Sequence, residues 1–404
     1  MRIKNVGVAL AALCFSQAGA RDCSSIDFRY WGVTFPDGES LNYPSDIDEY
    51  LINRQPRIIK GETKDWIIWS DDGCPTFVAP PNDSVDSDVD STESSSFIRS
   101  ELRELLTMYF DDSYSPKDIE NQWVTSKASS SNQNSAGGVN GNLKATLIVN
   151  SVTESGGNAE QEGRIVVGQI HGIDEEPVKI YYQKIAGQDK GSVYIRVDGE
   201  DGDPSDLITF FGYNDKITSV SRREQFEPTV DGIALGDEWG YEIDLTGDQL
   251  QVMITHDGKT YTTADAIAYS KQYMSESSSG SSAAYVQRVS SDTDAITIGS
   301  WYDNDFMYFK AGVYNQNKVG GGDDVASVTF TSLVQSHDNW TPKGNTQNTA
   351  PTPATTSTTQ NPQEKTSRAS GARFEVTARK MRIGVFCIFL INAHLLWESF
   401  WAAL

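Results

Sequence analysis

Short runs in which apolar and polar residues alternate fill the middle of the chain, and turn-forming residues bound each run. They include LKATLIVN, GRIVVGQIHG, VKIYYQK, SVYIRV, WGYEIDL, QLQVMITHDG and ASVTFTSLV. Successive side chains of a β-strand point to opposite faces, so this alternation predicts half-buried strands. No long amphipathic helical pattern interrupts the runs. The body of the chain is therefore predicted to be an all-β sandwich or barrel of antiparallel strands.

The two ends of the chain carry the patterns of targeting signals. Residues 1–20 combine a basic start, an apolar run and an Ala-Gly-Ala triplet, which is typical of a cleaved secretory signal peptide. Residues 370–372 are the small triplet Ser-Gly-Ala, and within 371–404 a basic spacer precedes an apolar tail. This pattern predicts a GPI-attachment signal, and a retained C-terminal membrane anchor is the alternative. Either one predicts a secreted protein held at the outer face of the plasma membrane.

The composition changes along the segment between these signals. Residues 339–370 are rich in Thr, Pro, Ser, Asn and Gln, which predicts an extended stalk. Residues 21–338 are left for one folded domain, and residues 82–96 form an acidic insertion loop within it. Asn82 and Asn339 each begin an Asn-x-Ser/Thr sequence, so both are predicted glycan acceptors.

The net charge and the cysteine content indicate which ligands and which disulfide the chain can have. A formal net charge of -23 argues against nucleic acid. Cys14 falls in the signal peptide and Cys387 in the apolar tail, which leaves Cys23 and Cys74 to form a disulfide in an oxidising compartment. No cysteine–histidine cluster has the spacing of a metal site, so neither a metal nor a cofactor is expected. We expect a monomer.

The stretch YFKAGVYNQN, residues 308–317, has an unusual polar face when it is placed on a strand. The residues of that face are Tyr308, Lys310, Gly312, Tyr314 and Gln316. The opposite face is apolar enough to pack in a core. Two tyrosines and a lysine replace the Thr, Ser or Glu of an ordinary solvated face.

The stretch FIRSELREL, residues 97–105, brings Arg99, Glu101 and Arg103 to one face if it is a strand. Its leucines also fit a helix, so periodicity leaves both alternatives open. On a strand, two arginines flanking a glutamate would form a cationic platform for carboxylates, with the glutamate holding both guanidinium groups. The simpler alternative is a surface ion-pair ladder.

The stretch VVGQIHG, residues 166–172, places Gln169 and His171 on one face of a predicted strand. His171 matters because its imidazole titrates near neutral pH. The other histidines are predicted to have structural positions only: His256 in a turn, His337 at the stalk boundary and His394 in the tail.

Together these stretches offer a carboxylate clamp, an amide, an imidazole and a phenol, a set that suits β-elimination from a uronic acid polymer. Neutralising the uronate carboxylate makes its C5 proton more acidic. A base then removes this proton and an acid protonates the departing O4. Glycoside hydrolysis would instead need two facing carboxyl groups, for which Glu242 and Asp244 are the nearest candidates.

The blocks RSELR, QIH and YFKAGVYNQ, in this order, closely resemble the three signature blocks of polysaccharide lyase family seven, the alginate lyases. The resemblance covers roughly residues 27–334, and the early YWGVTFPDG resembles the first strand of that family. It implies a concanavalin A-like β-jelly roll of two antiparallel sheets with a substrate groove on the concave sheet. It also implies a lyase that needs no metal or cofactor and cleaves an acidic polysaccharide, leaving a 4,5-unsaturated uronate.

The resemblance also implies roles for single residues. Arg103 and Gln169 would neutralise the substrate carboxylate, and His171 would be the base that acts on guluronate. Tyr314 would be the acid, and for mannuronate it would serve as both base and acid. The remaining residues of the three blocks are implied to bind substrate: Arg99, Glu101, Tyr308, Lys310 and Gln316.

The substrate and the activity leave alternatives open. Ile170 in the middle of QIH is associated in that family with guluronate-containing alginate. The acidic insertion, the cysteine pair and the anchor depart from the family pattern and indicate a eukaryotic relative, whose polymer could be another uronan such as glucuronan. The same sandwich also serves lectins, so a non-catalytic carbohydrate-binding protein at the cell surface is the second hypothesis.

Overall fold

The computed structural model describes the folded body of the chain. The described residues are 23, 25–82, 88–93, 95–155, 161–173, 175–198, 206–212, 232–268, 295–320 and 324–341. The predicted signal peptide, nearly all of the stalk, the segment 371–404 and part of the acidic loop lie outside them. In the part of the chain that is described, no helix is long and apolar enough to cross a membrane.

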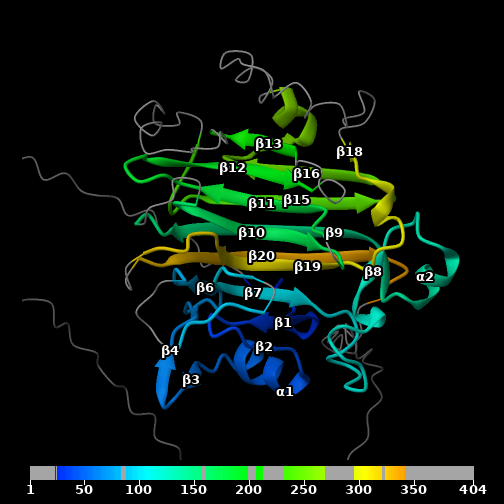
Figure 1. Cartoon of the computed structure of the whole chain (residues 1–404), viewed down its shortest axis with the longest axis horizontal. Coiled ribbons are helices and arrows are strands. Elements are labelled where there is room, and N and C mark those ends of the chain that lie inside the picture. The colour runs from blue at the N-terminus through cyan, green and yellow to red at the C-terminus, as the bar shows by residue number, and fades with distance from the viewer. Residues whose placement is uncertain are drawn as a thin grey trace, which may run out of the picture. The chain divides into compact units, whose positions relative to one another are not determined.

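Two nine-stranded sheets form the body, and their strands run across the view in Figure 1. The first, called the site sheet, has the order β13 (Asp206–Phe211), β12 (Lys190–Val197), β11 (Val178–Gln183), β10 (Arg164–His171), β19 (Tyr308–Asn315), β7 (Arg99–Glu104), β1 (Trp31–Thr34), β2 (Ser40–Leu41), with β14 (Ile233–Ala234) beside β12. The second, called the back sheet, has the order β17 (Lys259–Thr262), β16 (Gln249–His256), β15 (Glu238–Thr246), β9 (Gly138–Ser151), β20 (Ala326–Asp338), β6 (Pro75–Ala79), β5 (Ile67–Trp69), with β18 (Ile296–Thr297) beside β16 and β8 (Trp123–Val124) beside β9.

Short elements complete the body. A hairpin of β3 (Arg57–Ile59) and β4 (Glu62–Lys64) stands apart from both sheets. The helical turns include η1 (Phe28–Tyr30), α1 (Pro44–Asp46), η2 (Ile47–Ile52), η3 (Ile119–Asn121), α2 (Ser130–Ser135) and η5 (Ser300–Tyr302), and residues 263–268 are helical as well.

The alternating runs form strands, as the sequence predicted. All pairings in the two sheets are antiparallel except that of β8 with β9, which is parallel. The ambiguous stretch around Arg99 is a strand, β7, and the helical alternative is therefore wrong. The predicted two-sheet jelly roll is confirmed, whereas the substrate groove stays a prediction.

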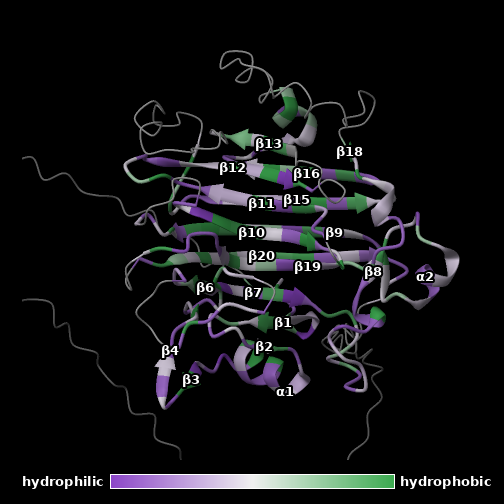
Figure 2. Ribbon diagram, in the orientation of Figure 1, coloured by the Kyte–Doolittle hydropathy of each residue, from purple (hydrophilic) through white to green (hydrophobic). Residues whose placement is uncertain are grey.

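The core lies between the two sheets. Along β15, Trp239, Tyr241, Ile243 and Leu245 are buried and alternate with more exposed residues. Figure 2 shows that hydrophobic and hydrophilic residues both occur along the strands. Burying one large apolar side chain contributes about 1.5–3 kcal/mol, so inward-facing rows of this kind provide the main stabilisation.

A disulfide and the acidic loop connect the edges of the body. The predicted Cys23–Cys74 bond is present, with the Cα atoms 5.2 Å apart, and it joins the N-terminal segment to the start of β6. In the described part of the acidic loop, Asp88 pairs with Lys60 at 2.5 Å and with Lys64 at 2.9 Å. The loop thus contacts the β3–β4 hairpin.

Candidate active site

The signature stretches, far apart in the chain, form adjacent strands in the order β10, β19 and β7. Lys310 on β19 lies opposite Arg103 on one side and Gln169 on the other. Tyr314 lies opposite Arg99. One face of the site sheet points away from the back sheet, and we call it the site face; it carries the side chains of Arg99, Glu101, Arg103, Gln169, His171, Lys310 and Tyr314. Phe309, Ala311 and Val313 are fully buried in the core beneath it.

Backbone irregularities set the register of the site face. The pairing of β10 shifts between Val166 and Gly168 against both neighbouring strands. Across from the shift, Gly312 has φ +147°, and a Cβ there would lie 2.5 Å from the carbonyl oxygen of Ser100. Only glycine accommodates both conditions, which explains the glycine inside this strand. The bulge lets Tyr314 and Val166 face each other while Lys310 still faces Gln169.

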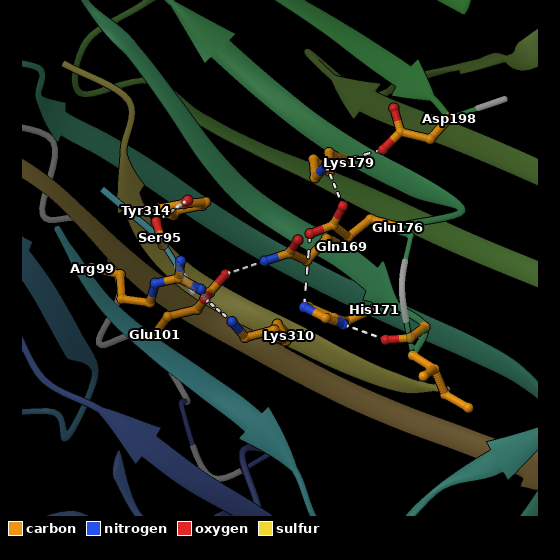
Figure 3. A network of polar contacts seen from close by, with 12 residues as sticks. Ser95, Arg99, Glu101, Gln169, His171, Glu176, Lys179, Asp198, Lys310 and Tyr314 are labelled. Carbon is orange, nitrogen blue, oxygen red and sulfur yellow. Dashed lines mark hydrogen bonds and ion pairs between the residues drawn. The ribbon is translucent and has the colours of Figure 1, made fainter. Parts of the chain in front are cut away.

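Glu101 is the centre of the polar contacts on the site face (Figure 3). Its carboxylate accepts a hydrogen bond of 2.6 Å from Nε2 of Gln169 and pairs with Lys310 at 2.5 Å and Arg99 at 3.2 Å. Burial alone would raise the pKa of Glu101, but Lys310 and Arg99 outweigh it and hold that pKa below its usual value. Glu101 is therefore an ionised anchor for these side chains rather than an acid that exchanges protons.

The expectation that Glu101 holds both arginines is wrong for Arg103. Arg103 lies over the ring of Tyr308, 3.7 Å from the centroid, and donates a 2.9 Å hydrogen bond to the carbonyl of Pro116. Lys310, directly opposite Arg103 in the register, occupies the second position at Glu101 instead. Sequence spacing on one strand could not show this, because the competing cation comes from the neighbouring strand.

Several donors and acceptors of the site face are left for a ligand. Within the described part of the chain, Oε1 of Gln169 and the Nε atoms of Arg99 and Arg103 are buried and have no hydrogen-bond partner. Buried polar atoms normally have partners, so these atoms mark where a polar ligand would bind. Arg99 also stacks on Tyr314, with its guanidinium carbon 3.9 Å from the ring centroid.

His171 has one ring nitrogen available as a base. Its Nδ1 lies 2.6 Å from the carbonyl oxygen of Gly172, an acceptor only, so Nδ1 carries the proton of the neutral ring. Burial and the positive charge of Lys310 lower the pKa of His171 to about 4, although Glu176 acts in the opposite direction. The imidazole is therefore neutral at pH 7, and Nε2 presents an unprotonated lone pair.

Two tyrosines flank this arrangement. Tyr308 stacks on the His171 ring with the centroids 4.9 Å apart, and burial raises its pKa. The Tyr314 hydroxyl lies 2.6 Å from Oγ of Ser95 in the acidic loop. In Figure 3, Tyr314 and His171 lie on either side of Gln169 and Lys310. The site face thus holds a neutral base and a phenolic hydroxyl with cations between them.

Lys310 and Gln316 are the remaining predicted substrate-binding residues of the third block. Burial and Arg99 lower the pKa of Lys310 to about 8, against the opposing effect of Glu101. Gln316 follows the end of β19, and its backbone N–H donates to the carbonyl of Arg164 at 2.9 Å. Its predicted contact with substrate stays a prediction.

Sequence reasoning missed other polar residues beside the site. Glu176 and Lys179 extend the network from His171, and Asp198 binds Lys179. Lys179 could have been noticed, because it interrupts the apolar run VKIYYQ next to the QIH block. Ser95 gave no signal, since its role depends on how the acidic loop folds back.

His337 lies next to the predicted stalk and has a structural position, as expected, but its contacts were not foreseen. It lies within β20, and its side chain is fully buried against Glu104, with 2.9 Å between Nε2 and Oε1. Glu104 was also missed, although a charged residue on the apolar side of β7 was a usable signal. The carboxyl pair considered for hydrolysis lies elsewhere: Glu242 and Asp244 are on β15 of the back sheet, where both bind Asn142.

Comparisons with known proteins agree with this geometry. The family model described as alginate lyase matches residues 26–337. An alginate lyase from Klebsiella pneumoniae is 32% identical over 339 residues, covering 82% of this chain and 97% of that protein. A crystal structure of the alginate lyase from the same organism superposes with a TM-score of 0.60 at 28% identity, covering 79% of this chain and 99% of that one. The chain therefore belongs to the alginate lyase family and is a polysaccharide lyase.

Proposed function

We propose that the protein cleaves alginate by β-elimination, with guluronate-containing blocks as the favoured substrate. The observation that carries this proposal is the pairing of a neutral His171 that has a free Nε2 with the cationic centre around Glu101 on one sheet face. The names of the similar proteins support alginate as the polymer.

Substrate binding rests on charge. Arg99, Arg103 and Lys310 outnumber Glu101 on the site face, so this region is locally positive in a chain of net charge -23. The substrate carboxylate would bind among the free Nε donors of Arg99 and Arg103, whereas the free Oε1 of Gln169, an acceptor, would take a hydrogen bond from a sugar hydroxyl. Neutralising the carboxylate stabilises the enolate-like transition state, and one such donor is typically worth about 10²–10³-fold in kcat.

The elimination then moves one proton onto the enzyme and one off it. Nε2 of His171 takes the C5 proton, and the electrons of that C–H bond form the C4–C5 double bond. The C4–O4 bond breaks, and the Tyr314 hydroxyl supplies the proton that O4 needs. The products are a 4,5-unsaturated uronate at the new non-reducing end and a chain with a restored hydroxyl. Both residues return to their starting states by exchange with water.

The guluronate preference rests on the resemblance of the QIH block. Ile170 is fully buried in the core beneath β10, so it would act through packing and not through contact with the sugar. Polyglucuronate remains the competing polymer. A lectin-like protein would bind these polymers without cleaving them.

One experiment separates these possibilities. The secreted body, residues 21–338, is offered polyguluronate, polymannuronate and polyglucuronate separately, and the ultraviolet absorbance of the new double bond is followed. We expect the fastest rise on polyguluronate. A rise in absorbance only on polyglucuronate would show that this polymer, and not alginate, is the substrate. Binding of a polymer without a rise in absorbance would favour the lectin-like alternative. His171→Ala is the matched inactive control.

We also propose that the enzyme is secreted and held at the cell surface by its C-terminal segment, as a monomer. The support is the sequence of residues 1–20 and 371–404, together with the Cys23–Cys74 disulfide, which suits an oxidising compartment. Asn82 and Asn339 are proposed glycan sites. Release of the protein from intact cells by a phosphatidylinositol-specific phospholipase would support the lipid anchor, and retention would favour a spanning segment.

A further inference from the structure

We propose that Glu176 is a positioning residue for the base: its carboxylate lies beside Nε2 of His171 and stabilises the imidazolium that forms when His171 takes the substrate proton. This inference rests on the proposed role of His171. It adds a residue that lies outside the signature blocks and has no role in the steps derived above.

The distance between the two side chains suits this role. Oε1 of Glu176 lies 3.7 Å from Nε2 of His171. That is too long for a hydrogen bond, so the Nε2 lone pair is not blocked in the resting enzyme. It is short enough for strong attraction once Nε2 carries a proton and the ring is positive. The contact therefore favours the state after proton transfer over the state before it, which is what accelerates a chemical step.

The carboxylate is held in place rather than free. Nζ of Lys179 lies 2.7 Å from Glu176 and 3.0 Å from Asp198, and Arg196 pairs with Asp198 at 2.7 Å. Lys179 and Asp198 are largely buried, with 12% and 5% of their side chains exposed. Figure 3 shows this row running from Asp198 through Lys179 and Glu176 to His171.

The hairpin that carries Glu176 is also tied down. The backbone N–H of Gly172 donates to the carbonyl of Glu175 at 2.9 Å. The N–H of Ile173 donates to the carboxylate of Asp305, which follows η5 on another part of the chain. These contacts hold the backbone of the hairpin, and Lys179 holds the Glu176 carboxylate itself.

Glu176 favours the positive charge on His171 more than any other group around the ring does. On β19, Lys310 is positive and disfavours the imidazolium, and Tyr308 covers one face of the ring beneath Arg103. On β7, Glu101 is already paired with Lys310, Arg99 and Gln169. Glu101 therefore favours the imidazolium less than Glu176 does, although Glu176 itself pairs with Lys179 on β11.

The first test compares Glu176→Gln with the unchanged full-length enzyme on polyguluronate. We expect kcat to fall about tenfold, the factor that one pKa unit of lost imidazolium stabilisation gives. KM should change less than about twofold, because the contact acts after binding. The acidic limb of the kcat/KM profile should move to lower pH, since the pKa of His171 falls when the negative charge is removed.

A matched control lies on the back sheet. Glu242→Gln on β15 removes the same charge far from His171 and should leave the acidic limb where it is. Glu176→Asp keeps the charge and should recover part of kcat. An unchanged acidic limb in Glu176→Gln, or a rise in KM alone, would overturn the proposal and make Glu176 a contact to a sugar hydroxyl.

A second measurement does not depend on activity. The His171 imidazole is titrated by nuclear magnetic resonance without substrate, in the unchanged protein and in Glu176→Gln. A lower pKa in the variant supports the coupling even if no polymer is cleaved, so failure of the proposed function and failure of this inference remain distinguishable. Equal pKa values in the two proteins would overturn it.

Discussion

Two buried glutamates on one strand, Glu101 and Glu104, do different work because they point to opposite sides of it. Glu101 faces the site face and binds the side chains of Arg99, Lys310 and Gln169. Glu104 faces the core and binds His337 of the back sheet and the backbone N–H of Phe309. Both carboxylates are almost completely removed from water.

The difference lies in what each glutamate joins. Glu101 orients groups that would touch substrate, all from the site sheet. Glu104 and His337 connect the two sheets across the core, and the ring of His337 also contacts Trp123 and Phe309. Nδ1 of His337 lies 2.7 Å from the carbonyl of Asn140, so both ring nitrogens face oxygen acceptors.

The comparison predicts that the site face can lose its base without unfolding, with the largest expected effect on activity. His171→Ala should reduce cleavage of polyguluronate about 10³-fold, since it removes a general base. Its free energy of unfolding should change by less than about 1 kcal/mol. Double-bond absorbance and urea denaturation measure the two quantities. His256→Ala is the control, and a parallel loss of activity there would point to a general defect.

Substitution of Glu104, on the core side of β7, should reduce stability. Glu104→Ala should lower the free energy of unfolding by about 3 kcal/mol, because it leaves Phe309 N–H and His337 Nε2 buried without a partner. Urea denaturation checks this. A double replacement, Glu104→Leu with His337→Phe, removes both partners and should recover part of the loss. Equal midpoints for the single variant and the unchanged protein would contradict the structural role.

A matched pair of amide substitutions sharpens the contrast further. Glu101→Gln should lower kcat/KM about 100-fold, because Arg99 and Lys310 lose the charge that orients them. Glu104→Gln, which makes the same change three residues along β7, should leave kcat/KM within about threefold at low temperature. Steady-state rates on one polymer measure kcat/KM for both variants. Equal losses of kcat/KM would show that Glu101 and Glu104 do not have different roles.

The smallest predicted effect concerns pH. Activity should rise as His171 loses its proton with a pKa of about 4, and it should fall as Lys310 loses its charge near a pKa of about 8. Lys310→Arg keeps a cation at high pH, so the basic limb should move upward by at least about one unit. A basic limb that stays in place would assign it to another group.

The lowered pKa of Glu101 also predicts how the stability of the fold depends on pH. The pKa of Glu101 is below its usual value in the folded protein, so its ion pairs stabilise the fold above the pKa of the unfolded chain. That contribution is lost as the pH falls through the lowered folded pKa. The unfolding free energy of the unchanged protein should therefore decrease in acid, and Glu101→Gln should show a shallower decrease.

Local patterns were sufficient for much of the architecture. Period-two alternation predicted the strands, and the signature blocks predicted which of them carry polar side chains. Two cysteines left in the body predicted their own pairing. The alternation and the signature blocks depend on residues that are close in sequence, and the disulfide followed from the number of cysteines in the body. None of these predictions needed tertiary information.

Local patterns did not predict which residues the polar side chains contact. The sequence by itself predicted that Arg99, Glu101 and Arg103 would share a face if the stretch was a strand, but only the strand order placed Lys310 opposite Arg103 and in contact with Glu101. It predicted a structural position for His337, and only the packing of the two sheets revealed its contact with Glu104. Alternation is a property of one strand, whereas charge pairing depends on which strands become neighbours, and that is decided by the whole fold.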